Sequence, residues 1–146
     1  MKLLGKEQSL VLWCFSVFLL LSGCGRTEPE CDSLDTRHSV VKIASDDNNN
    51  KLVNYAVKNS ILVAAMVSDK SEAEKSAIWE KARQAALYRL DNTILLNSRN
   101  RAAQEVTCIG LLSVTVADVT AQKEVEFEVK QTADGKSIVS VNPFLF

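Results

Sequence analysis

The sequence is poor in the residues that most enzymes use for catalysis, since His38 is its only histidine. It also lacks a glycine-rich phosphate loop, a G-x-S-x-G nucleophile elbow and a histidine-bearing metal motif. We interpret His38 as a solvated or structural residue, and we predict no catalytic residue, no metal site and no cofactor. Carboxylate pairs that a fold brings together leave no signature in a sequence, so an enzyme with an unrecognised site is kept as an alternative.

Neither an excess of basic charge nor a long hydrophobic run is present. Lys and Arg together number 17 against 18 Asp and Glu, and no basic block is interleaved with aromatic residues. We therefore predict no nucleic-acid partner. The longest largely apolar run, residues 10–21, has 12 residues, of which only Ser16 is polar, whereas a membrane-spanning helix needs roughly 20. This run is too short to cross a bilayer as a helix.

What the run does match is an export signal. Lys2 and Lys6 precede it, and it ends in Leu21-Ser22-Gly23-Cys24, which is similar to the lipobox of bacterial lipoproteins. We predict that residues 1–23 are a cleaved signal peptide and that Cys24 carries a diacylglycerol and an acylated amino group. Two or more acyl chains hold a protein stably on a bilayer. The alternative is an uncleaved anchor, or a buried helix, with an incidental cysteine.

The residues after the lipobox bear on which membrane holds the protein. In Gram-negative lipoproteins the residue after the lipidated cysteine is the main sorting signal, and here it is Gly25, followed by Arg26. Aspartate at this place is the usual inner-membrane retention signal, and glycine is a weaker one. We expect a lipid-anchored protein on the inner membrane, facing the periplasm, with the outer membrane as the alternative.

Two cysteines remain once Cys14 has left with the signal peptide and Cys24 is lipidated. They are Cys31 and Cys108. The periplasm is oxidising, so we predict a disulfide between them, with two separate buried thiols as the alternative. Two thiols alone do not complete a tetrahedral metal site.

The mature chain of 123 residues is long enough for one domain with a core but not for two. Residues 24–32 are polar and contain Pro29, and we interpret them as a lipidated tether. Residues 33–146 are then a single periplasmic α+β domain.

Helical patterns dominate the first part of this domain. Residues 33–44 and 52–58 have apolar residues at helical spacing, and the polar segment 46–50 between them predicts a turn that caps the second helix. This turn superficially resembles an EF-hand loop, but it lacks the required glycine and glutamate. The continuous apolar run 61–67 fits either a helix or a buried strand.

The clearest helical pattern covers residues 68–92. Ser71 and Glu74 form an S-x-x-E capping box, and the residues that follow are rich in Ala, Glu, Lys and Leu. An apolar stripe through Ile78 and Ala82 predicts the buried side. Trp79 and Tyr88 suggest a ligand box, but aromatic residues at helical spacing are more often part of a core or its rim.

Strand patterns follow, with a period of two. The predicted strands are residues 93–97, 106–116, 123–130 and 137–141, with a loop over 98–103 and a hairpin turn at Asp134-Gly135. Residues 106–116 are apolar on both faces, which predicts a central strand in which Gly110 marks a bulge or a close approach. Residues 123–130 alternate, with glutamates facing water. We predict an antiparallel sheet of three to four strands with the N-terminal helices packed on one face.

Four segments of the sequence carry a resemblance to a known group of proteins. The lipobox LSGC, together with EVTCIGLLSV, KEVEFEVKQTADGK and VNPFLF, resembles the small prophage-encoded lipoproteins of enterobacteria of the YafY and YfjS type. The resemblance implies an inner-membrane location and a link to the Cpx envelope stress response, and it transfers no catalytic residue. The expected function is therefore a non-enzymatic envelope role through protein contacts, with a periplasmic small-ligand binder or enzyme as the alternative.

Overall fold

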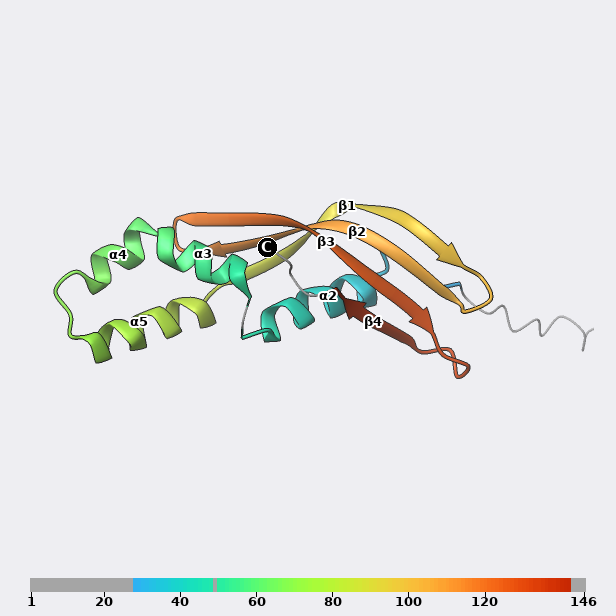
Figure 1. Ribbon diagram of the computed structural model, residues 1–146, viewed down its shortest axis with the longest axis horizontal. Coiled ribbons are helices and arrows are strands. Elements are labelled where there is room, and N and C mark those ends of the chain that lie inside the picture. The colour runs from blue at the N-terminus through green and yellow to red at the C-terminus, as the bar shows by residue number, and fades with distance from the viewer. Residues whose placement is uncertain (1–27, 49, 143–146) are drawn as a thin grey trace, which may run out of the picture.

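The computed structural model describes residues 28–48 and 50–142, in which four helices precede four strands (Figure 1). The helices are α2 (Leu34–Asp46), α3 (Lys51–Asn59), α4 (Ile61–Val67) and α5 (Glu72–Gln84). The strands are β1 (Leu87–Asn100), β2 (Glu105–Val116), β3 (Val119–Gln131) and β4 (Ser137–Val141). The predicted α+β class, with helices ahead of an antiparallel sheet, is confirmed.

The strands form one antiparallel sheet in the order β1-β2-β3-β4, so each pairs with its neighbour in the sequence. β2 and β3 lie inside the sheet, and for β2 this is the central position that the two apolar faces of residues 106–116 predicted. Ala117, in the tight turn between them, has a left-handed φ of 50°. Gly135 has a φ of 84° in the turn from β3 to β4, where Asp134-Gly135 predicted a hairpin.

The core lies between one face of the sheet and the helices α2 and α3. Even-numbered residues of β2 and odd-numbered residues of β3 point towards this face. The largest buried side chains there are Val106, Leu112, Val114, Phe127 and Val129. The helices contribute Val40, Ala44, Leu52, Val53, Ala56 and Val57. Burial of each large apolar side chain contributes about 1.5–3 kcal/mol, so this interface is the main source of stability.

Polar residues cap the starts of the helices. Ser33 accepts a hydrogen bond from the Thr36 amide at 3.2 Å and caps α2. Asn50 caps α3 through the Leu52 amide at 2.9 Å. Asn50 is completely buried and also donates to the Ala44 carbonyl at 2.8 Å, which ties the start of α3 to the end of α2. Both halves of the predicted capping box at the start of α5 are present.

The helix predicted over residues 68–92 is wrong in its last third, after residue 84. α5 ends at Gln84, and the chain enters β1 at Leu87. Tyr88 pairs with Val114 and Leu90 pairs with Leu112, both in β2. Pairing with the sheet and burial of Leu90 therefore outweigh the helix propensity of this segment. The loop predicted to begin at residue 98 also starts later, because β1 continues to residue 100.

β1 is bulged next to Gly110, because residues 91–93 of β1 lie opposite the single residue Leu111 of β2. Its register with β2 shifts between Leu90 and Ile94, and the carbonyls of Leu90 and Asp91 accept hydrogen bonds from Arg37 Nη2 of α2, each at 3.1 Å. A Cβ atom at Gly110 would lie 3.0 Å from Leu90 Cδ1. The predicted close approach at Gly110 is confirmed, and the extra residues belong to the partner strand.

Part of the predicted organisation lies outside the described residues, namely the signal peptide 1–23 and residues 24–27 of the tether. Within 28–48 and 50–142, no helix is long and apolar enough to cross a membrane.

Candidate functional site

The disulfide predicted from the cysteine count is present. Cys31 and Cys108 are bonded, with their Cα atoms 5.8 Å apart. Cys108 lies inside β2 and is completely buried, whereas Cys31 lies just before α2 and is partly exposed. The bond links positions 77 residues apart, which corresponds to about 4 kcal/mol in the chain-entropy description of disulfides. The start of the described chain is thereby fixed to a central strand.

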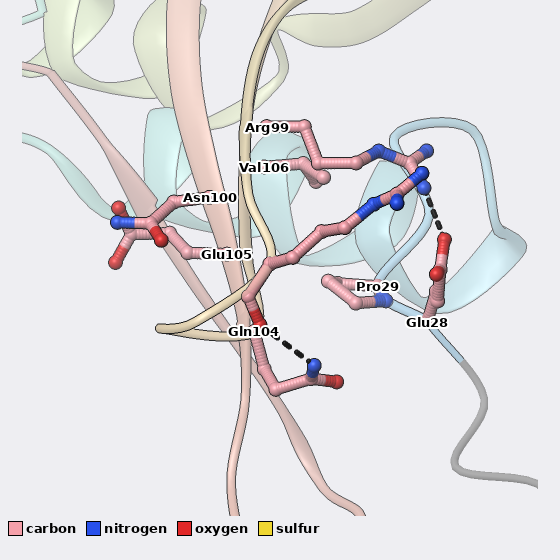
Figure 2. Close-up of a pocket in the computed structure, with 8 residues that line it drawn as sticks. Glu28, Pro29, Arg99, Asn100, Gln104, Glu105 and Val106 are labelled. Carbon is pink, nitrogen blue, oxygen red and sulfur yellow. Dashed lines mark hydrogen bonds and ion pairs between the residues drawn. The ribbon is translucent and has the colours of Figure 1, made fainter.

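Two further contacts hold the residues ahead of the disulfide. Glu28 forms an ion pair with Arg99 of β1 (Figure 2). The carbonyl oxygen of Glu30 accepts a hydrogen bond from Thr36 Oγ1 at 3.0 Å. The described part of the predicted tether therefore lies against the body of the protein, at the end of the sheet where β1 turns into β2.

A small hollow lies between this segment and the β1–β2 turn (Figure 2). It is lined by Glu28, Pro29, Arg99, Asn100, Arg101, Gln104, Glu105 and Val106. The hollow offers about 10 Å³ to the centre of a water molecule, which is room for about one water. Sites for small organic ligands are typically about 300–1,000 Å³. We therefore regard the hollow as a packing feature of the ion-paired turn.

The predicted lipidation residue Cys24 and the predicted sorting residues Gly25 and Arg26 lie outside the described residues. Cys24 precedes Glu28 by four residues, which is at most about 14 Å of extended chain. A lipid on Cys24 would therefore hold the bilayer close to the β1–β2 turn.

The opposite end of the molecule carries a helix with an exposed apolar surface. α4 and α5 form a hairpin there, with α4 at the outer side of α3 (Figure 1). All seven residues of α4 are apolar, yet only Val63 is buried. Ile61, Leu62 and Met66 are 76%, 53% and 54% exposed. A helix that is apolar on all sides is normally buried, so this surface is the strongest candidate for an interaction site.

Asp118, from the turn between β2 and β3, holds α4 in place. Its carboxylate accepts hydrogen bonds from Ser60 Oγ and from the backbone amides of Ile61 at 3.2 Å and Leu62 at 3.3 Å. The hydrogen bond from Ser60, together with those from the backbone amides, lowers the pKa of Asp118. A negative charge at a helix N-terminus is also favourable. The first turn of the exposed helix is thus fixed to the sheet.

α5 packs on α3 and α4 without burying any residue completely. Ile78 and Ala82 are its partly buried apolar residues, as the predicted stripe indicated. Arg83 Nε donates to Asn54 Oδ1 of α3 at 2.9 Å, and Arg83 also pairs with Glu80 at 3.3 Å. The α4–α5 hairpin, residues 61–84, is therefore held mainly by its side contact with α3 and by its caps.

The face of the sheet that α2 and α3 leave uncovered is a second candidate surface. β3 places three glutamates on it, Glu124, Glu126 and Glu128. β1 and β2 place apolar side chains beside them, namely Leu87, Leu95, Ile109 and Leu111. Asn97 and Asn142 donate to the Glu126 carboxylate at 3.2 Å and 2.6 Å. This face is mixed in character and less apolar than α4.

The remaining candidates from the sequence do not converge on a site. His38 is exposed on α2. Trp79 is 38% exposed at the rim of the hairpin. Burial, and to a smaller extent the Asp47 carboxylate, raises the pKa of Tyr88. In the described part of the chain, no three His, Cys, Asp or Glu side chains gather closely enough to hold a metal ion.

Sequence reasoning missed two features of this region. It left residues 61–67 open between helix and strand, and it gave no sign that their side chains are exposed, because a continuous apolar run usually indicates burial. It also missed Asp118, which lies 57 residues from Ile61. The only local signal was Ser60, which has the residue type of a helix cap immediately before the run.

No protein-family model, no curated protein and no solved structure matches this chain. Its function must therefore be inferred from its own residues and their arrangement.

Proposed function

We propose that this protein is a bacterial lipoprotein, anchored by acyl chains on Cys24, that acts through contacts with other envelope proteins and does no chemistry of its own. It faces the periplasm from the inner membrane. Through these contacts it influences envelope stress signalling of the Cpx type.

The observation that carries this proposal is where the exposed helix lies relative to the start of the described chain. Glu28 is paired at the β1–β2 turn, and Asp118 caps α4 just after the end of β2. β2 has 12 residues, which span about 40 Å at 3.3 Å per residue. A lipid at one end of the sheet leaves the apolar surface of α4 about one sheet length away, where it is available to a protein.

Two observations support the envelope location. The lipobox-like segment ends at Cys24 after an apolar run of export-signal length. The bond between Cys31 and Cys108 fits an oxidising compartment such as the periplasm. The link to stress signalling is supported by the resemblance of four sequence segments to prophage-encoded lipoproteins.

The central test replaces the acylated residue. Cys24→Ala is expected to abolish incorporation of labelled fatty acid, to leave unprocessed precursor, and to remove the effect of overproduction on a Cpx-responsive reporter. Cys14→Ala is the matched control, because it changes a cysteine within the signal and is expected to keep all three. Fatty acid incorporation into Cys24→Ala, or full reporter response from an unlipidated folded form, would contradict the proposal.

The membrane is tested separately by density-gradient fractionation. The native chain is expected to sediment with inner-membrane markers, and Gly25→Asp should do the same because aspartate after the lipidated cysteine is the usual retention signal. If the native chain sediments with outer-membrane markers while Gly25→Asp does not, the inner-membrane assignment is wrong and the lipidation stands.

A further inference from the structure

We infer that the exposed face of α4 is the contact surface of a homodimer, in which the α4–α5 hairpins of two copies pack together as a four-helix bundle. Ile61, Leu62, Ala65 and Met66 form this face. The four residues lie at spacings of one, three, four and five, which places them on one side of a helix. Two helical hairpins that bury such faces against each other give the common bundle arrangement.

Charge favours a second copy over a partner of opposite charge. α4 has no charged residue, and the hairpin as a whole has equal numbers of acidic and basic residues. The acidic ones are Asp69, Glu72, Glu74 and Glu80, and the basic ones are Lys70, Lys75, Lys81 and Arg83. The hairpin therefore has no net charge that would repel an identical hairpin or attract a strongly charged protein. An uncharged apolar face is complementary to itself.

The position of the hairpin also allows a closed two-fold contact, a step that rests on the proposed lipid anchor. Anchors on Cys24 place all copies in one leaflet, with the same end of the sheet towards the bilayer. A two-fold axis perpendicular to the membrane then brings two hairpins together at the same height. In such an isologous contact the same residues meet on both sides, so the pair is closed.

The size of the surface sets the strength of the dimer. α5 has 13 residues and is about 20 Å long, and two adjacent helices of about 10 Å width present at most roughly 400 Å² per copy. The total of about 800 Å² is below the roughly 1,200 Å² of stable complexes. The dimer should therefore be weak in dilute solution and strengthened when lipid anchors confine both copies to one membrane.

A lipid surface fits α4 less well. Helices that lie in a bilayer interface combine an apolar face with a strongly charged one. α4 has seven residues, or about 10 Å of helix, and carries no charged side chain on any side. The apolar surface of another copy therefore matches this uncharged helix better than lipid headgroups do.

The test uses thiol crosslinking of the full chain in its own membranes. Cys31 and Cys108 are bonded, so Ala65→Cys adds a reactive thiol at the centre of the proposed contact. A short bismaleimide is expected to give a product of twice the chain mass. Ala102→Cys, an exposed position in the β1–β2 turn, is the matched control and is expected to give at least about tenfold less dimer.

A second pair of variants tests whether the apolar face is the cause. Met66→Lys in the Ala65→Cys chain is expected to lower the crosslinked dimer at least about tenfold, because it buries a charge at the contact. Ile138→Lys changes a side chain of the same exposure, 55% against 54%, on the open face of the sheet, and is expected to leave the yield unchanged.

Four results would overturn the dimer. They are no crosslink from Ala65→Cys, an equal yield from Ala102→Cys, a yield that survives Met66→Lys, and a crosslink to a chain of another mass. Protection of the new thiol from a water-soluble maleimide without any crosslink would instead assign the face to the bilayer. The chain without an added cysteine is treated with the bismaleimide and labelled with fatty acid in parallel. A crosslink in this chain, or loss of the fatty acid label, would reveal a free Cys24 thiol and so show separately whether the lipid anchor has failed.

Discussion

The two pairs of helices in this protein are built from similar local signals but differ in how they are held. α2 and α3 bury Val40, Ala44 and four residues of α3 against the sheet. α4 buries only Val63, and α5 buries no residue completely. Short isolated helices are marginal in water, so tertiary packing stabilises the first pair, whereas caps and one side contact hold the second. We expect the α4–α5 hairpin to be the less stable part of the molecule.

The largest difference should appear on truncation of apolar side chains. Phe127→Ala removes a completely buried ring beneath the helices and is expected to lower the free energy of unfolding by about 3–5 kcal/mol. Met66→Ala, on exposed α4, should change it by less than about 0.5 kcal/mol in a monomeric sample. Urea denaturation at low protein concentration measures both. Equal losses would mean that the hairpin belongs to the same cooperative core.

Loss of the disulfide should destabilise α2, α3 and the sheet and leave the stability of the α4–α5 hairpin nearly unchanged. Replacing Cys31 and Cys108 together by alanine is expected to cost about 2–4 kcal/mol, because the bond joins the residues ahead of α2 to β2. Hydrogen exchange should show faster opening of α2 and of the sheet, with little change in the amides of α5. A loss confined to α4 and α5 would contradict the comparison.

The helix caps offer a matched pair of smaller changes. Asn50→Ala removes a completely buried cap that also bonds to the Ala44 carbonyl, and is expected to cost about 1–3 kcal/mol. Ser71→Ala removes the exposed cap of α5 and should cost about 0.5–1 kcal/mol. Thermal unfolding monitored by circular dichroism measures both. A larger effect at Ser71 would show that α5 depends on its cap more than α3 does.

The smallest effect is expected from protonation of Asp118. Its pKa is lowered in the folded protein, so its contribution is complete above the unfolded-state value of about 3.9 and is lost as the pH falls through the lower folded-state pKa. Protection factors of the Ile61 and Leu62 amides should fall across this acid range, while those of α3 should not. Asp118→Asn is the control and should remove the pH dependence. Unchanged protection in the native chain would rule out this role.

The sequence predicted those parts of the fold that depend on local patterns. The polar segment 46–50 caps α3 through Asn50, Ser71 and Glu74 form the predicted capping box of α5, and the alternation of residues 123–130 correctly placed Phe127 inside. These features are set by neighbours within a few residues, which a sequence displays directly.

Features set by distant residues could not be predicted in the same way. The segment from Leu87 to Leu90 has a helical pattern and becomes a strand only because β2 supplies partners more than 20 residues later. Asp118 caps α4 across a longer gap of 57 residues, from a turn that the apolar run gave no reason to consider. The exposure of α4 depends on how α3 is placed, which no local pattern encodes. The candidate interaction surface was therefore visible only in the structure.

The bond between Cys31 and Cys108 also determines how the protein responds to mechanical force. A pull on the chain ahead of Glu28 must first separate the ion pair with Arg99, and it then reaches Cys31. From there the covalent route leads directly to Cys108, which is paired with Leu96 of β1 on one side and with Phe127 of β3 on the other. α2 is bypassed and bears little of the load. If the proposed lipid anchor holds the chain on a membrane, tension from that membrane would be delivered to β2, which is paired with strands on both sides. A reductant would redirect the same tension into unwinding α2 from its first turn.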